Sequence, residues 1–182
     1  MKLLFILSLF IVSCSSNDDG PNQLNGNKSG YSLTIEGDKT YSGAWDGDSE
    51  EGAIISLYTK GDQEEGGTEY ISLIIADDPN DFSLNGALTL NSQTQQPLPL
   101  GNLANDDMED ADHSSIIITI GDKNYISNSG SAKISNFKKT MFGPFSGFAS
   151  YDMEIDGKFD LTDTKTVEQI KIKGTVRVIS YL

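Results

Sequence analysis

The chain has 182 residues, with 27 acidic against 13 basic residues and a formal net charge of −14. This balance argues against nucleic-acid binding and against adsorption to anionic lipid through a basic surface, because both need clustered Lys and Arg. The single cysteine excludes an intrachain disulfide, and one cysteine with one histidine excludes the usual four-ligand zinc sites.

The N-terminus predicts export from the cytoplasm. Lys2 precedes an apolar run over residues 3–12 and the small residue Ser13, which is the pattern of a secretory signal peptide. The run is shorter than the roughly 20 apolar residues that span a bilayer. Residues 11–14 read Ile-Val-Ser-Cys, and this quartet resembles the lipobox of bacterial lipoproteins. The resemblance implies cleavage before Cys14 and acylation of its sulfur; the alternative is an ordinary cleaved signal peptide.

The segment after the cysteine is polar and acidic. Residues 15–29 are rich in Ser, Asn, Gly and Asp, so we expect a flexible tether. Ser15 resembles the sorting pattern of outer-membrane lipoproteins, and residues 16–20 resemble the acidic export signal of surface lipoproteins in the Bacteroidetes. These resemblances imply a lipid anchor in the outer membrane and exposure at the cell surface. We therefore divide the chain into a signal peptide (1–13), a lipidated cysteine with its tether (14–29) and one domain (30–182).

The chain beyond residue 30 predicts β-strands, because apolar and β-branched runs alternate with turn residues and helical spacing is not sustained. Three pairs, Gly37-Asp38, Gly121-Asp122 and Asp156-Gly157, predict tight turns. The expected strands lie at residues 31–36, 40–45, 53–59, 70–76, 82–90, 114–120, 124–127, 132–137, 145–155, 158–161 and 167–179.

Alternation within these runs predicts two layers. In the last run the apolar residues Ile170, Ile172, Val176 and Val178 share one parity, which is typical of a strand with one buried face. Residues 116–118 are three consecutive isoleucines, as in a strand covered on both faces. We expect an all-β fold, an antiparallel β-sandwich of about ten strands. A closed, lipocalin-like antiparallel β-barrel is the alternative, since successive hairpins fit both.

Two places predict ligand binding. Trp45 ends an expected strand, and the face of its ring could stack on a sugar, so Trp45 is a candidate ligand-binding residue. The long segment over residues 91–112 carries carboxylates that could gather calcium, the one cofactor we consider, although a solvated run of charge is the alternative. The candidate metal ligands are Asp106, Asp107, Glu109, Asp110 and Asp112.

The sequence shows no recognisable catalytic motif. His113 has no G-x-S-x-G serine to activate, so we interpret it as a partly exposed histidine at a strand edge. We expect Phe142, Phe145 and Phe148 to pack in the core rather than to bind a ligand. A glycan hydrolase remains an alternative, because glycoside hydrolysis needs only two suitably placed carboxylates and the chain has 27 acidic residues; so many acids also make a chance pair common.

The last third of the chain resembles the closing strands of uncharacterised β-rich lipoproteins from flavobacteria. The matching residues lie at positions 125, 127–131, 143, 145–147 and 155–159, while Pro144 departs from the family's pattern of a small polar residue there. The resemblance implies a fold and a location but no reaction. We therefore expect an outer-membrane or cell-surface lipoprotein with a non-catalytic module that binds a glycan or a surface protein. The alternatives are a carboxylate-based glycan hydrolase and a lipocalin-like carrier of an apolar ligand.

Overall fold

Nine β-strands and one short 3-10 helix form the regular structure of the part of the chain that can be described. The computed structural model describes residues 27–37, 39–46, 52–61, 67–102, 112–162 and 168–180. The elements are β1 (Ser29–Ile35), β2 (Thr40–Trp45), β3 (Gly52–Lys60), β4 (Glu69–Asp77), η1 (Asp78–Asn80), β5 (Phe82–Leu90), β6 (Ser115–Ile120), β7 (Lys123–Met141), β8 (Ser146–Leu161) and β9 (Gln169–Val178). The described residues contain no helix with the length and apolarity needed to cross a bilayer.

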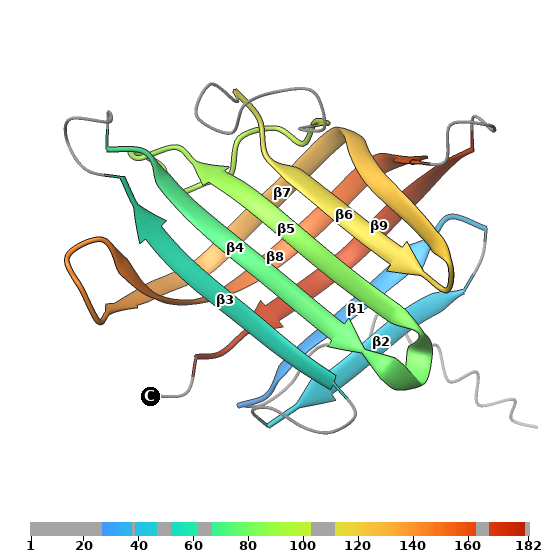
Figure 1. Ribbon diagram of the computed structural model, residues 1–182, viewed down its shortest axis with the longest axis horizontal. Helices are drawn as coiled ribbons and strands as arrows, with labels where there is room; N and C mark the ends of the chain where they lie inside the picture. The colour runs from blue at the N-terminus through green and yellow to red at the C-terminus, as the bar shows by residue number, and fades with distance from the viewer. Residues whose placement is uncertain are drawn as a thin grey trace, which may run out of the picture.

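The strands form two layers that cross steeply (Figure 1). The front layer consists of β3, β4, β5 and β6, and the back layer of β7, β8, β9, β1 and β2, all paired antiparallel. Strand β7 joins the layers, because its first residues pair with β6 and the remainder pairs with β8. At the opposite corner β8 pairs with β3 over the three residues 146–148. This short pairing closes the corner, whereas β9, β1 and β2 extend the back layer and β2 shares no pairing with β3 in the described residues. The two facing layers form an all-β sandwich, as expected.

Side chains of one parity in each strand fill the space between the layers. In β8 the buried residues include Ala149, Tyr151, Met153 and Ile155, as the alternation predicts. The prediction that both faces are covered at residues 116–118 is wrong. Only one face of β6 lies on the core, so the side chain of Ile117 remains 38 % exposed on the outside.

Two pairs of predicted strands are continuous in the structure. Residues 124–127 and 132–137 both belong to β7, and residues 145–155 and 158–161 lie almost entirely within β8. The predicted turn at Asp156-Gly157 is therefore wrong. Gly157 pairs with Gly130 across β7, and Gly130 has φ +128 with a hypothetical Cβ only 2.4 Å from the Asp156 carbonyl oxygen. These glycines permit the two backbones to approach closely, so the ribbon continues instead of turning.

The first half of the long segment after β5 closes one end of the sandwich. The Leu98 amide donates to the Thr89 carbonyl, and the Gln96 side chain exchanges two hydrogen bonds with the backbone of Ile134 in β7. Leu100 is only 4 % exposed. Residues 91–102 therefore belong to the packed domain.

Candidate functional site

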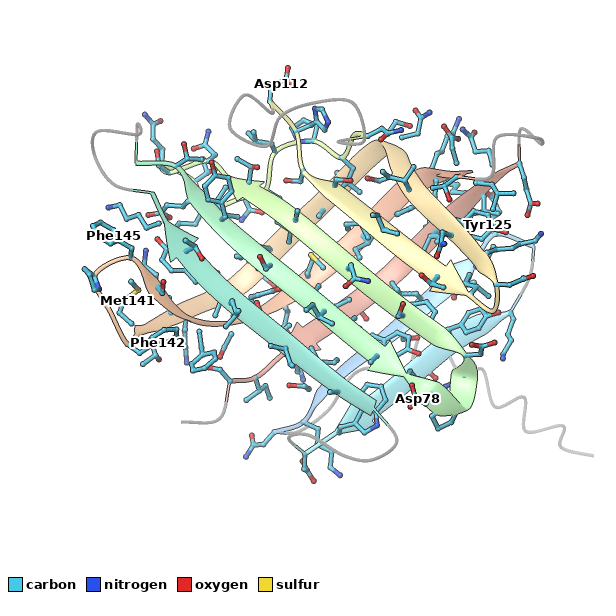
Figure 2. All side chains as sticks on the ribbon, viewed as in Figure 1. Asp78, Asp112, Tyr125, Met141, Phe142 and Phe145 are labelled. Carbon is cyan, nitrogen blue, oxygen red and sulfur yellow. The ribbon has the colours of Figure 1, made fainter. Side chains whose placement is uncertain are left out.

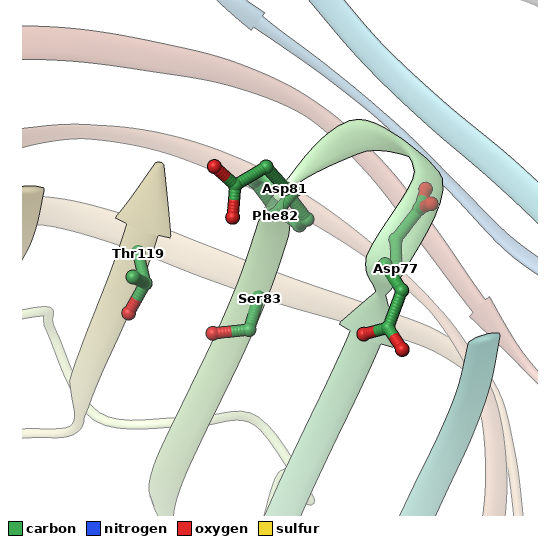
Figure 3. A pocket seen from close by; sticks show the side chains of 6 residues that line it. Asp77, Asp81, Phe82, Ser83 and Thr119 are labelled. Atoms are coloured by element: carbon green, nitrogen blue, oxygen red, sulfur yellow. The ribbon is translucent and has the colours of Figure 1, made fainter. Parts of the chain in front are cut away.

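A pocket of about 310 Å³ lies at the turn between β4 and β5 (Figure 3). The turn is η1, which begins after Asp77 and ends at Asp81, a residue in the left-handed conformation with φ 50. This tight turn brings three carboxylates close together beside the paired hydroxyl residues of β5 and β6. The pocket is lined by Asp77, Asp78, Asp81, Phe82, Ser83 and Thr119.

Asp77 has a structural role in this pocket. Its side chain is 2 % exposed, and its Oδ2 accepts from the Tyr31 hydroxyl at 2.5 Å and from the Asn80 side-chain amide at 2.8 Å. Burial, reinforced by the hydrogen bond to Asp77, raises the pKa of Tyr31 well above its ordinary value. Because Asp77 is engaged in joining β1 to the turn, the exposed Asp78 and Asp81 are the carboxylates that face solvent.

Trp45 lies near this pocket, but its ring packs mainly against neighbouring residues of the domain. Its ring centroid is 6.0 Å from that of Tyr31, which in turn stacks on Phe82. A Cβ on either Gly43 or Gly52 would fall 2.4 Å from the indole, so the ring covers both glycines at the seam between β2 and β3. The half-buried ring offers a ligand only its remaining surface, and ligand binding by Trp45 stays a prediction.

Calcium binding stays a prediction, because Asp112 is the one candidate ligand among the described residues. Asp106, Asp107, Glu109 and Asp110, like Cys14, lie outside the described residues. Asp112 is exposed, and its Oδ1 lies 2.9 Å from Nδ1 of His113, whose hydrogen bond lowers the pKa of the carboxyl. His113 is partly exposed just before β6, as interpreted from the sequence. Within the described ranges no three metal-ligating side chains form a cluster.

A second buried carboxylate lies at the other end of β4 and was not predicted. Glu69 is 6 % exposed, and its oxygens lie 3.5 Å from the Lys139 ammonium and 2.8 Å from the side-chain amide of Gln95. The same ammonium donates to the Tyr58 hydroxyl at 2.7 Å. Burial, followed by the Glu69 hydrogen bond, raises the pKa of Tyr58. This network ties β7 to β3 and β4, and its partners are too far apart in sequence to be recognised there.

The outer surface of the front layer, which we call the front face, is uncharged. Ile55 of β3 lies opposite Ile74 of β4, and these side chains are 42 % and 46 % exposed. Leu57 and Ile117 are exposed on the same surface. The register places uncharged residues throughout the centre of this surface, namely Ala53, Ile55, Leu57, Thr59, Ser72, Ile74, Ala76, Ser83, Asn85, Ala87, Ile117 and Thr119.

The outer surface of the back layer, the back face, is charged. Asp152 of β8 pairs with Arg177 of β9 at 2.6 Å, and Asp156 pairs with Lys173 at 2.9 Å. Such surface ion pairs contribute little stability, but they keep a surface hydrated. The absence of charge from the described front face is therefore a local property of one side of a strongly acidic protein.

The turn between β7 and β8 carries exposed aromatic residues (Figure 2). Phe142 and Phe145 are 61 % and 49 % exposed and Met141 is 41 % exposed, so the prediction that these phenylalanines pack in the core is wrong. The half-buried Phe148 contacts Phe142, with ring centroids 5.1 Å apart. The cause is that β7 and β8 extend past the body of the sandwich, where no facing layer covers their ends. We call residues 141–145 the hairpin tip.

No protein-family model, curated protein or solved structure matches this chain. The candidate sites therefore rest on their own geometry. The candidate surfaces are the uncharged front face, the pocket beside η1 and the exposed hairpin tip.

Proposed function

We propose that this chain is a lipid-anchored protein of the bacterial outer membrane, exposed at the cell surface, whose β-domain is a non-catalytic module that binds a protein partner. The observation that carries the binding role is the front face. A chain with 40 charged residues among 182 places none at the central outward positions of four adjacent strands, while the back face carries several.

The chemistry of the front face favours a protein over a glycan. Depletion of charge at the centre of a surface is a property of protein interfaces. The most exposed large side chains there are aliphatic, and the aromatic Tyr70, which shares their outward parity on β4, is half-buried; recognition of sugars generally uses the exposed flat face of an aromatic ring. The small residues Ser72 and Ala87, which pair across β4 and β5, lie beside these aliphatic side chains.

The proposed location rests on the N-terminal sequence. The signal peptide, the lipobox-like quartet ending in Cys14 and the acidic segment after it together support anchoring. Two acyl signals or more are needed for lasting attachment, and the multiple chains of a bacterial lipoprotein satisfy that requirement.

The pocket beside η1 favours a second candidate, a glycan-directed site that includes the carboxylate-based hydrolase considered above. Asp78 and Asp81 supply exposed carboxylates, and Ser83 and Thr119 supply hydroxyls. Replacing both aspartates by Asn should abolish hydrolysis of a glycan panel if this candidate is correct. An apolar carrier has less support, because the described side chains between the layers form one packed cluster.

Anchoring is tested on the full chain expressed in a bacterium that processes lipoproteins. Mass spectrometry of the mature protein should find an acylated N-terminal Cys14, and the protein should fractionate with the outer membrane. A Cys14→Ser variant should lose both properties. Unmodified Cys14 in mature protein would contradict the anchor.

Partner binding is tested by placing a photoreactive amino acid at position 74 on the front face, with position 154 on the back face as the matched exposed control. Irradiation of intact cells should give one discrete cross-linked protein from position 74 and none from position 154. Equal cross-linking from both positions would refute a specific front face. A product with twice the mass of this chain would replace the proposed partner by a second copy.

A further inference from the structure

We propose that the hairpin tip contacts the lipid bilayer to which the N-terminus is anchored and thereby orients the domain. This inference rests on the lipid anchor proposed above and goes beyond it, because an anchor alone does not say which side of the domain faces the membrane. The ligand is the interfacial region of a bilayer, where exposed aromatic and Met side chains leave water and pack at the boundary between headgroups and acyl chains.

The position of β1 relative to the tip supports this orientation. Strand β1 begins at Ser29. Its residue Gly30 pairs with Arg177 of β9, Arg177 pairs with Asp152 of β8, and Asp152 pairs with Ser135 of β7, so these residues form one row across the back layer. From that row β7 and β8 continue together as far as Met141. The tip therefore projects from the end of the back layer at which β1 begins (Figure 1).

The distances are compatible with contact. Between Asp152 and Ser146 the strand advances roughly 20 Å, at about 3.4 Å per residue, so the tip lies well beyond the start of β1. Even fully extended, the residues between Cys14 and Ser29 cannot span more than about 50 Å. A tether of this reach allows the tip to touch the bilayer, and the tip extends beyond the start of β1 along the back-layer strands (Figure 1).

The composition of the tip suits the interface. Phe142, Phe145 and Met141 are all exposed, and a Cβ on Gly143 would meet nothing within 4 Å, so the apex is open on the described structure. Lys138 precedes the tip and is exposed, and a long lysine stem can lie along apolar surface while its ammonium group reaches a lipid phosphate. Glu69, the buried acid nearby, is already paired with Lys139.

This orientation has a consequence for the proposed partner. Figure 2 shows Met141, Phe142 and Phe145 at the end of the β7–β8 hairpin, to one side of the two layers. With the tip on the membrane, the front face stands upright and is open to a neighbouring surface protein from the side.

The test uses mature, acylated protein reconstituted into phosphatidylethanolamine vesicles. Gly143→Cys introduces a thiol at the apex for an environment-sensitive fluorophore, while Glu154→Cys on the back face is the matched control; the chain's own cysteine is occupied by lipid. Flotation of the vesicles reports anchoring, and quenching by nitroxide-labelled lipid reports contact. We expect a blue-shifted, quenched signal at position 143 and an unshifted, unquenched signal at position 154.

A second variant assigns the contact to the aromatic residues. Adding Phe142→Ser and Phe145→Ser to the Gly143→Cys protein should remove most of the quenching, with flotation and the thermal midpoint unchanged. Protein that floats without quenching at position 143 would overturn the tip contact and leave the anchor intact. Equal quenching at both positions, or quenching that survives loss of both phenylalanines, would also overturn it. Protein that carries no lipid and does not float would overturn the anchor, and the orientation with it.

Discussion

Removal of the Tyr31 hydroxyl tests how much the hydrogen bond from Tyr31 to the buried Asp77 carboxylate contributes to the free energy of unfolding. Tyr31 is fully buried, and its hydroxyl donates to Asp77 Oδ2 at 2.5 Å. In Tyr31→Phe the ring keeps its stacking on Phe82 and Trp45, so the change isolates this hydrogen bond. A hydrogen bond to a carboxylate contributes about 1.5 to 3 kcal/mol, and leaving a buried acceptor short of a donor removes that contribution.

For a domain of this size a loss of about 2 kcal/mol corresponds to a fall of roughly 4 to 8 °C in the thermal midpoint. The assay is urea and thermal unfolding followed by circular dichroism. Tyr41→Phe is the matched control, because Tyr41 stacks on the same Phe82 ring but is only half-buried. The Tyr41→Phe variant should lose no more than about 0.5 kcal/mol of unfolding free energy. Equal losses in the two variants would refute the assignment of stability to the Tyr31–Asp77 bond.

Three further predictions concern stability. Burial raises the pKa of Tyr31, Tyr58 and Tyr151, so the unfolded chain releases these phenolic protons near pH 10 while the folded chain keeps them. Stability should therefore be retained below about pH 10 and fall above it, by up to about 1.4 kcal/mol per pH unit for each tyrosine. Phenolate absorbance before unfolding that exceeds what the other four tyrosines can supply would contradict this. Gly130→Ala should destabilise the domain by about 1 to 3 kcal/mol, because φ +128 and the Asp156 carbonyl oppose a side chain, whereas Gly143→Ala at the open tip should be neutral in the same unfolding assay. Lys139→Met should lower the free energy of unfolding by about 1 to 3 kcal/mol, because it leaves Glu69 with one donor fewer. Lys138→Met, at the exposed neighbouring position, should lower it by less than about 0.5 kcal/mol. Similar losses in the two variants would argue against the Glu69 network.

The sequence by itself determined the fold class and most of the strands. Alternation of apolar and polar residues is a local property, so residues 40–45 and 82–90 predict β2 and β5 with their observed bounds. The positive φ of Gly37 and Gly121 agrees with the predicted turns there for the same reason. The lipobox-like quartet is also local, which is why a proposal about location could be made without the fold.

Only the tertiary structure decided which residues are covered and which remain free. Asp156-Gly157 has the composition of a turn, but pairing with Gly130 across β7 keeps it within β8. Phe142 is apolar, but β7 and β8 extend past the facing layer and leave it exposed. The uncharged front face emerges only when register aligns residues of four strands, and Tyr31 meets Asp77 only when β1 lies beside the β4–β5 turn. Each depends on contacts between distant segments, which local patterns do not encode.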